Sequence, residues 1–189
     1  GVYNVRIRPP VANAAIALTG ASNQFQLIDC RIQGKAGSYY GIRTDGAQSN
    51  VRIERCEFFY LNTVDYGIAI SGHTYSGTEP AGWMVLESLF HSNLKHIECR
   101  MRQSIIRGCM LAGKGLIADG NMDDITTGID ISGAVGGCNL VQGNVLGGDY
   151  STATYVAGTD DNWIGNTSDD LAEAEVDSAT GTTIAVPAA

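Results

Sequence analysis

Short alternations of apolar and polar residues recur along the chain, each followed by a small residue. Residues 51–58, VRIERCEF, are the clearest copy, with the order apolar, any, apolar, any, any, Cys, any, apolar. The third and eighth positions stay apolar in residues 25–32, 83–90, 104–111 and 138–145, where Cys30, Ser88, Cys109 and Gly143 take the small position. An internal repeat of this kind predicts a repeat architecture.

A second pattern precedes most of these segments. It alternates apolar and polar residues, ends with Gly, and occurs at residues 15–20, 41–46, 67–72 and 128–133, with a poorer copy at 96–101. Period-two alternation indicates strands, and no apolar stripe of period 3.6 is visible, so we predict an all-β chain. The isoleucines at positions 16, 42 and 68 are 26 residues apart, which sets the length of one turn.

Turns of this length predict a β-solenoid of about six coils, in which each strand pairs with its equivalent about 4.8 Å away. Equivalent side chains then form columns. We predict an inward column of Ile16, Ile42, Ile68, Ile97 and Ile129, and a corner column of Cys30, Cys56, Ser88, Cys109 and Gly143.

The repeat covers residues 1–168, which we expect to form one domain. Val5 and Ile7 already fit the strand pattern, so we expect the chain to begin inside a coil, with an amino-terminal part missing. Residues 169–189 abandon the repeat. Because the end of a solenoid exposes unpaired backbone groups, we predict that this segment is a cap or an oligomerisation tail.

The repeat resembles the coils of one known family. The G-I-x-I-x-G strand and the N-V-x-I-x-x-C-x-F strand of residues 50–58 are similar to those of right-handed parallel β-helices of the pectate-lyase type, and residues 161–166 resemble their last coil. The resemblance implies a right-handed, single-stranded parallel β-helix. That fold carries pectate lyases, polygalacturonases, epimerases, alginate lyases and phage tailspikes, so it leaves the function open.

Charge is distributed unevenly along the chain. The first 114 residues hold twelve basic and eight acidic residues, a net of +4, and the last 75 hold twelve acidic residues and no basic one, a net of −12. The overall charge of −8 disfavours nucleic acid as a partner. No apolar run is long enough for a membrane span. We interpret the acidic exterior as a solubility feature, with a cation site or a basic neighbour as the alternative.

The five cysteines match no zinc-binding spacing and form no CxxC motif. Three occupy the corner position, and Cys99 and Cys138 occupy apolar strand positions, so we predict free, buried thiols. Free thiols suit assembly inside a bacterial cell better than they suit a secreted enzyme held by disulfides.

Candidate catalytic residues are the carboxylates at outward strand positions: Glu98, Asp130 and Asp45. Glu98 and Asp130 would be neighbours if the long fourth turn keeps the register. Hydrolases of the similar family use aspartates on neighbouring coils, and its lyases use bound Ca²⁺ and a base. The N-T-D and G-H-G patterns of polygalacturonases and the R-x-P-x-x-R pattern of pectate lyases are missing, which argues against both enzymes.

Candidate ligand-binding residues are Arg43 on a strand face, and His73, Tyr75 and Trp83 in or beside an insertion between two strands. Loops on a rigid scaffold collect binding residues, and the aromatic rings could stack on a sugar. Trp83 also fits the first apolar position of the repeat, which favours a core role. The other histidines, His91 and His96, we expect to be exposed.

A candidate calcium loop contains Asp119, Asn121, Asp123 and Asp130 at positions one, three, five and twelve. Asp124 stands where such a loop requires Gly, and no flanking helices are predicted. We therefore favour a polar excursion between coils, and expect no other cofactor.

Two functions remain. The first is a structural and receptor-binding module of a phage tail spike or fibre: a homotrimer in the virion that contacts a bacterial surface polysaccharide. The alternative is a secreted polysaccharide lyase or glycoside hydrolase acting on an anionic glycan. The free thiols and the lack of a recognised catalytic set favour the first.

Overall fold

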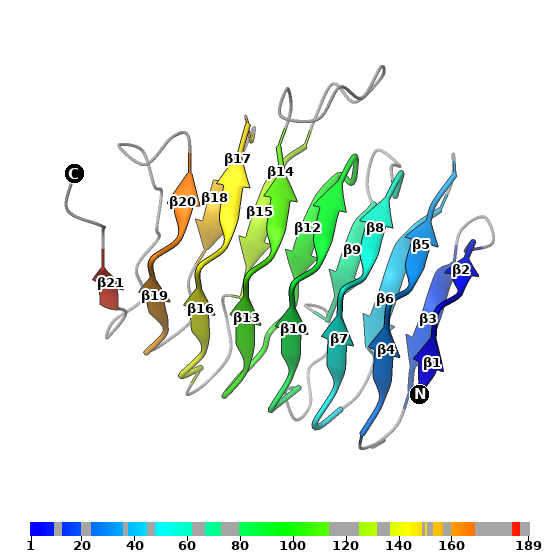
Figure 1. Ribbon diagram of the computed structural model, residues 1–189, viewed down its shortest axis with the longest axis horizontal. Helices are drawn as coiled ribbons and strands as arrows, with labels where there is room; N and C mark the ends of the chain where they lie inside the picture. The colour runs from blue at the N-terminus through cyan, green and yellow to red at the C-terminus, as the bar shows by residue number, and fades with distance from the viewer. Residues whose placement is uncertain are drawn as a thin grey trace.

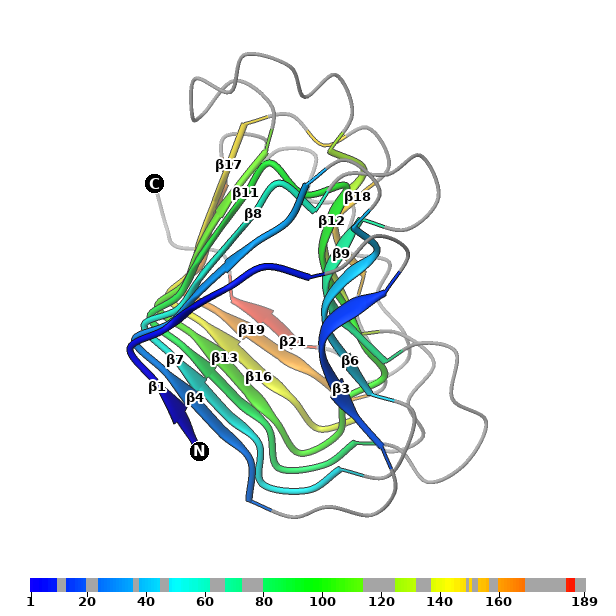
Figure 2. The ribbon, with the colours of Figure 1, turned by 90° about the vertical axis from the view of Figure 1, so that its right-hand side faces the viewer.

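The computed structural model describes residues 1–9, 13–19, 24–35, 38–44, 48–61, 67–72, 80–113, 125–131, 137–148, 150, 153–156, 160–168 and 183–185. Within these ranges the regular elements are strands, and all the paired strands are parallel. They wind into a parallel β-helix with three faces (Figures 1 and 2). The predicted fold class is confirmed.

Each face is one sheet. Sheet A contains β1 (Val2–Tyr3), β4 (Gln26–Ile28), β7 (Arg52–Glu54), β10 (Met84–Leu86), β13 (Ile105–Arg107), β16 (Leu140–Gln142), β19 (Asn162–Ile164) and β21 (Thr183–Ala185). Sheet B contains β2 (Arg6–Ile7), β5 (Arg31–Gln33), β8 (Glu57–Phe59), β11 (Leu89–His91), β14 (Met110–Ala112), β17 (Val145–Gly147) and β20 (Thr167–Ser168). Sheet C contains β3 (Ala14–Leu18), β6 (Tyr40–Thr44), β9 (Ile68–Ser71), β12 (Lys95–Glu98), β15 (Thr127–Asp130) and β18 (Ala153–Val156).

Each coil passes from sheet A to sheet B and then to sheet C. In the described residues, coils 1 to 6 contribute one strand to every sheet, and β19 and β20 begin coil 7. Figure 2 shows the sheets as three sides of a prism, with a tight corner between sheets A and B. The expected number of coils, about six, agrees with this arrangement.

The core lies inside the prism, and each sheet contributes one inward column to it. Sheet A contributes Leu27, Ile53, Val85, Ile106, Val141 and Trp163; sheet B contributes Ile32, Phe58, Phe90, Leu111 and Leu146; sheet C contributes Ile42, Ile70, Ile97, Ile129 and Tyr155. The rings of Phe58 and Phe90 stack at 5.0 Å between centroids. Burying each such side chain stabilises the fold by about 1.5–3 kcal/mol.

Two predicted column members are wrong. In sheet C the register joins Ile42 to Ile70 and Ile70 to Ile97, so Ile68 is two residues out of place. In the corner column the register pairs Met110 with Val145, which places Asn144, not Gly143, beside Cys109. The error at Ile68 is a shift of two residues and keeps the side chain on the inward face, because side chains alternate with period two. The error at Gly143 is a shift of one residue and reverses the face.

The A–B corner has the same two-residue form in each coil. Its first residue is in the left-handed region, with φ of 49° at Asn4, 54° at Asp29, 49° at Arg55, 46° at Glu87, 64° at Gly108, 62° at Gly143 and 61° at Gly165. In coils 2 to 7 its second residue points inward: Cys30, Cys56, Ser88, Cys109, Asn144 and Asn166 are all at most 2% exposed. The stacking of Cys30 on Cys56 is therefore confirmed.

Side-chain hydrogen bonds connect these corners from coil to coil. Asn144 accepts the amide N–H of Cys109 (2.8 Å) and donates to the carbonyl of Ile106 (3.0 Å) and to Oδ1 of Asn166 (2.8 Å). In earlier coils Cys56 Sγ lies 3.4 Å from the carbonyl oxygen of Leu27. The bonds of Asn144 to Cys109 and Ile106 satisfy backbone groups that would otherwise be buried without these partners.

All five cysteines are free, and four of them are buried. Burial raises the pKa of Cys56 to about 11 and that of Cys109 to about 12, so both remain protonated at neutral pH. Cys138 is exposed, which corrects the prediction for this residue. It occupies a left-handed corner (φ 47°) whose side chain points outward.

The end of the chain adds one strand to the solenoid. β21 pairs with β19 and places Ile184 beside Trp163. Most of the predicted tail, residues 169–182 and 186–189, lies outside the described residues, so the capping role stays a prediction. No helix in the described part of the chain has the length and apolar character needed to cross a bilayer.

Candidate ligand-binding groove

A hollow in the described surface follows the A–B corner through coils 2 to 4. Its volume is about 430 Å³, and it is lined by Asp29, Cys30, Arg31, Arg55, Cys56, Glu57, Glu87 and Leu89. The buried thiols form the floor, because the corner turns them inward. We call this hollow the corner groove.

The corner geometry produces the two walls of the groove. The residues before and after each inward thiol point outward. Equivalent residues of successive coils lie in register, so they form columns. The left-handed column supplies Asp29, Arg55 and Glu87, and the first outward column of sheet B supplies Arg31, Glu57 and Leu89.

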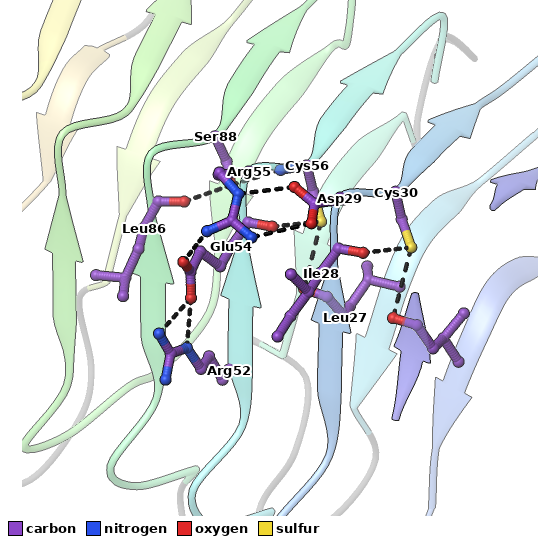
Figure 3. A network of polar contacts seen from close by, with 11 residues as sticks. Leu27, Ile28, Asp29, Cys30, Arg52, Glu54, Arg55, Cys56, Leu86 and Ser88 are labelled. Atoms are coloured by element: carbon purple, nitrogen blue, oxygen red, sulfur yellow. Dashed lines mark hydrogen bonds and ion pairs between the residues drawn. The ribbon is translucent and has the colours of Figure 1, made fainter. Parts of the chain in front are cut away.

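The left-handed wall is held by an ionic network (Figure 3). Arg55 donates two hydrogen bonds to the carboxylate of Asp29, at 2.7 and 2.9 Å. It also binds Glu54, whose carboxylate in turn pairs with Arg52. The hydrogen bonds from Arg55, reinforced by its positive charge, lower the pKa of Asp29, and the same bonds raise the pKa of Arg55. Both groups are charged at neutral pH.

The sheet B wall continues this network. Nε of Arg31 lies 2.7 Å from Glu57, and the other oxygen of Glu57 lies 3.3 Å from Nε2 of His91. Nδ1 of His91 lies 3.0 Å from the hydroxyl oxygen of Ser92. His91 is only 9% exposed, so the expectation that it is exposed is wrong.

Aromatic rings extend the sheet B wall away from the corner. Phe59 stacks on the ring of His91 with centroids 5.3 Å apart. Tyr60 lies beside Phe59 at 5.2 Å and is 45% exposed. Tyr60 therefore offers a ring face and a hydroxyl group to a molecule in solution, which is the surface that aromatic side chains present to sugars.

The charged residues of this corner share one backbone conformation. Asp29, Arg55 and Glu87 have positive φ, although a side chain with a Cβ atom is disfavoured in that region. The later coils place Gly at the same corner position. The same conformation also occurs at non-glycine residues outside the groove, such as Gln24, Asn50 and Gln103. It therefore belongs to the turns of the solenoid, and the charge of the corner is what distinguishes the groove.

The chemistry of the groove suits binding. Its carboxylates accept hydrogen bonds, its guanidinium groups donate them, and Leu89 adds an apolar contact. Burial raises the pKa of the Cys56 thiol and keeps it protonated, and Ser92 is fully buried, so these two residues are poorly placed to act as nucleophiles.

The carboxylates predicted from the sequence lie on another face. Glu98 pairs in register with Asp130 on sheet C, as predicted, so the long fourth turn does not shift the register. The carboxylate of Glu98 lies 2.6 Å from Lys95 Nζ. Arg43, on the same outward column, lies 5.4 Å from the ring centroid of Tyr40. Figure 2 places sheet C across the prism from the A–B corner, so none of these residues joins the groove.

Trp83 is a core residue. It is fully buried, and its indole N–H donates to the carbonyl of Gln48 at 3.0 Å, so it cannot stack on a ligand as proposed. Of the other predicted site residues, Asp45, His73, Tyr75, Asp119, Asn121 and Asp123 lie outside the described residues. The described residues contain no group of three or more His, Cys, Asp or Glu that could hold a metal ion.

His96 is also buried, contrary to expectation. Asn93 Nδ2 lies 3.3 Å from Nδ1 of its ring, and Nε2 donates to the carbonyl of Ala112 at 3.0 Å. Burial lowers the pKa of His96 to about 3, so the ring is neutral. It connects coil 4 to coil 5 and is structural.

The residues of the groove were not selected from the sequence, although a signal was present. The corner triplets read Asp-Cys-Arg at 29–31 and Arg-Cys-Glu at 55–57. Stacking the second triplet on the first brings opposite charges together on both sides of the thiol. Reversal of charge between successive repeats could therefore have identified both ion pairs.

Comparison with known proteins does not extend this assignment. No family model matches the chain, and searches of curated proteins and of solved structures find no match.

Proposed function

We propose that this chain is a structural and receptor-binding module of a phage tail spike or fibre, built on a β-helix of the pectate-lyase type. In this proposal it forms a homotrimer in the virion and contacts a bacterial surface polysaccharide through the corner groove. The protein acts as a rigid surface that holds a glycan and does not cleave it.

One observation carries the proposal: charged side chains from three successive coils line a groove on the outside of an apolar prism. The ion pairs of Arg55 with Asp29 and of Arg31 with Glu57 fix donors and acceptors before any ligand arrives. Preorganised polar groups and an exposed ring such as Tyr60 reduce the entropy that binding would otherwise lose. This arrangement favours recognition of a polyhydroxylated ligand.

Binding of surface polysaccharide by the purified chain tests the proposal. The double variant Arg31→Ala/Arg55→Gly should lower the affinity at least about tenfold, because it removes two groups of charge-assisted donors. The control is Arg107→Ala, which removes an exposed arginine of β13 outside the groove and should leave the affinity unchanged. Loss of binding in Arg43→Ala instead would place the ligand on sheet C and refute the groove.

The competing enzyme function has its own readout. Incubation of the chain with bacterial surface polysaccharide and with anionic glycans should release no reducing ends and no unsaturated uronate absorbance. Turnover that disappears in Glu98→Gln or Asp130→Asn would establish a lyase or hydrolase on sheet C and overturn the adhesive function. The trimer is tested separately by the mass in solution, where a monomer would contradict it.

A further inference from the structure

We infer that the corner groove selects a neutral, hydroxyl-rich glycan segment over an anionic one. The inference rests on the proposed function, because it names the class of glycan that the groove would hold. It follows from the balance of charge along the two walls.

Both arginines that line the groove are already partnered. Arg31 pairs with Glu57, and Arg55 pairs with Asp29 and Glu54. An anionic sugar would have to displace one of these carboxylates, which leaves that carboxylate without its cation. Hydroxyl groups need no such exchange, since they donate to the free lone pairs of the carboxylates and accept the remaining guanidinium N–H groups.

The lining also carries an excess of negative charge. Two arginines face three carboxylates, those of Asp29, Glu57 and Glu87, so the lining has a net charge of −1. Glu87 is exposed in coil 4, and within the described residues no ion pair joins it to a cation. A sugar carboxylate placed near Glu87 would be repelled, whereas a pair of sugar hydroxyls could both donate to it.

The non-polar parts of the groove fit the same class of ligand. Leu89 lies beside Glu57 in the lining, and the exposed Tyr60 follows β8 outside the lining. These groups can cover the C–H face of a sugar ring while the hydroxyl groups at its edge reach the charged side chains. Three coils, at about 4.8 Å per step, extend the groove over about 10 Å along the solenoid axis. That length suits a short oligosaccharide.

Calorimetric titration with matched oligosaccharides tests the inference. The probes are neutral hexose oligomers and uronate-containing oligomers of the same length, taken from bacterial surface polysaccharides, and both are measured at low and high salt. We expect the neutral oligomer to bind about fivefold more tightly at low salt, with the ratio falling towards one as salt screens the repulsion. Glu87→Gln should reduce the low-salt ratio, because it removes the excess negative charge.

The control is Asp160→Asn, which removes an exposed carboxylate before β19, outside the groove, and should preserve the ratio. Tighter binding of the uronate oligomer, or a ratio that Glu87→Gln does not change, overturns the selectivity and leaves the proposed function standing. Failure of both oligomers and of the intact surface polysaccharides to bind overturns the proposed function itself. The two failures are therefore distinguishable.

Discussion

The A–B corner of coils 2 to 4 and the same corner of coils 5 to 7 solve one backbone problem differently. Both halves use a left-handed residue followed by an inward residue. The first half places Asp29, Arg55 and Glu87 in the left-handed position, and the second half places Gly there in every coil. The charged half carries the groove, and the glycine half has a smooth corner with nothing within 4 Å of a Cβ atom built at Gly143.

The inward residues change along the solenoid as well. Thiols fill coils 2, 3 and 5, and Ser88 of coil 4 donates to the carbonyl of Leu86 at 2.7 Å. Asn144 and Asn166 fill coils 6 and 7 and hydrogen-bond in succession. The comparison indicates that the two halves differ in role. Glycine in the left-handed position and buried hydrogen bonds stabilise the carboxy-terminal coils. The amino-terminal coils keep a less favourable corner conformation and display charged side chains there.

Acid should lower the free energy of unfolding more than any substitution below, because it protonates a buried histidine that joins coil 4 to coil 5. His96 joins coil 4 to Ala112 of coil 5 and has a pKa lowered by burial to about 3, against an ordinary value of 6.5. Between these values the unfolded chain binds a proton that the folded chain does not. The free energy of unfolding should therefore fall as pH falls, by up to about 5 kcal/mol at pH 3.

Urea unfolding between pH 7 and pH 4 measures this dependence. The matched variant is His96→Gln, whose amide can still donate to the carbonyl of Ala112 but does not titrate. Its free energy of unfolding should depend much less on pH between 6.5 and 4.5. Parallel curves for the two proteins would show that His96 does not control acid stability.

Removal of an inward corner side chain should have the next largest effect, and the two halves should respond differently. Asn144→Ala leaves the N–H of Cys109 and the carbonyl of Ile106 buried without these partners, which costs on the order of 3–5 kcal/mol. Cys56→Ala removes only long thiol contacts and a small apolar volume, about 1–2 kcal/mol. The urea midpoints of the two variants measure these losses of stability. Equal losses would show that the inward residues of the two halves contribute equally.

The sequence predicted the fold because apolar alternation and the small corner residue repeat with similar spacing, and burial requires that spacing. The slip at Gly143 had a physical cause: Leu140 and Val145 are apolar, and so are Val141 and Leu146 one residue later. The hydrophobic pattern alone cannot choose between these registers. Buried hydrogen bonding selects the second register, because only that register places Asn144 inside the corner.

The groove was harder to predict because its partners meet only across coils. Arg31 and Glu57 are 26 residues apart, and Glu57 and His91 are 34 apart, so their contact depends on the lengths of the intervening loops. Exposed charges are also common on solvated strands, which makes any single one uninformative. Only the register of the coils brings these scattered charges together as two walls.

A smaller loss should follow from adding one methyl group to the glycine half. Gly143→Ala places a Cβ atom on a residue with φ of 62°, and nothing lies within 4 Å of it, so the cost is conformational, about 1 kcal/mol. The reciprocal change, Glu87→Gly, removes a Cβ atom from φ of 46° and should not lower the urea midpoint. A larger loss in Glu87→Gly than in Gly143→Ala would show that the charged corner stabilises the fold.

The smallest effect on stability should come from Arg55→Gly. The variant loses an exposed ion pair with Asp29, which contributes little in water, and a partly buried pair with Glu54, which keeps its pairing with Arg52. It gains the residue best suited to φ of 49°. We therefore expect an unchanged urea midpoint together with weaker glycan binding. This result would show that Arg55 contributes to ligand binding and not to the stability of the fold. A clear fall in the midpoint would instead assign the network of Figure 3 a structural role, and the charged half would then differ from the glycine half only in how it closes the same turn.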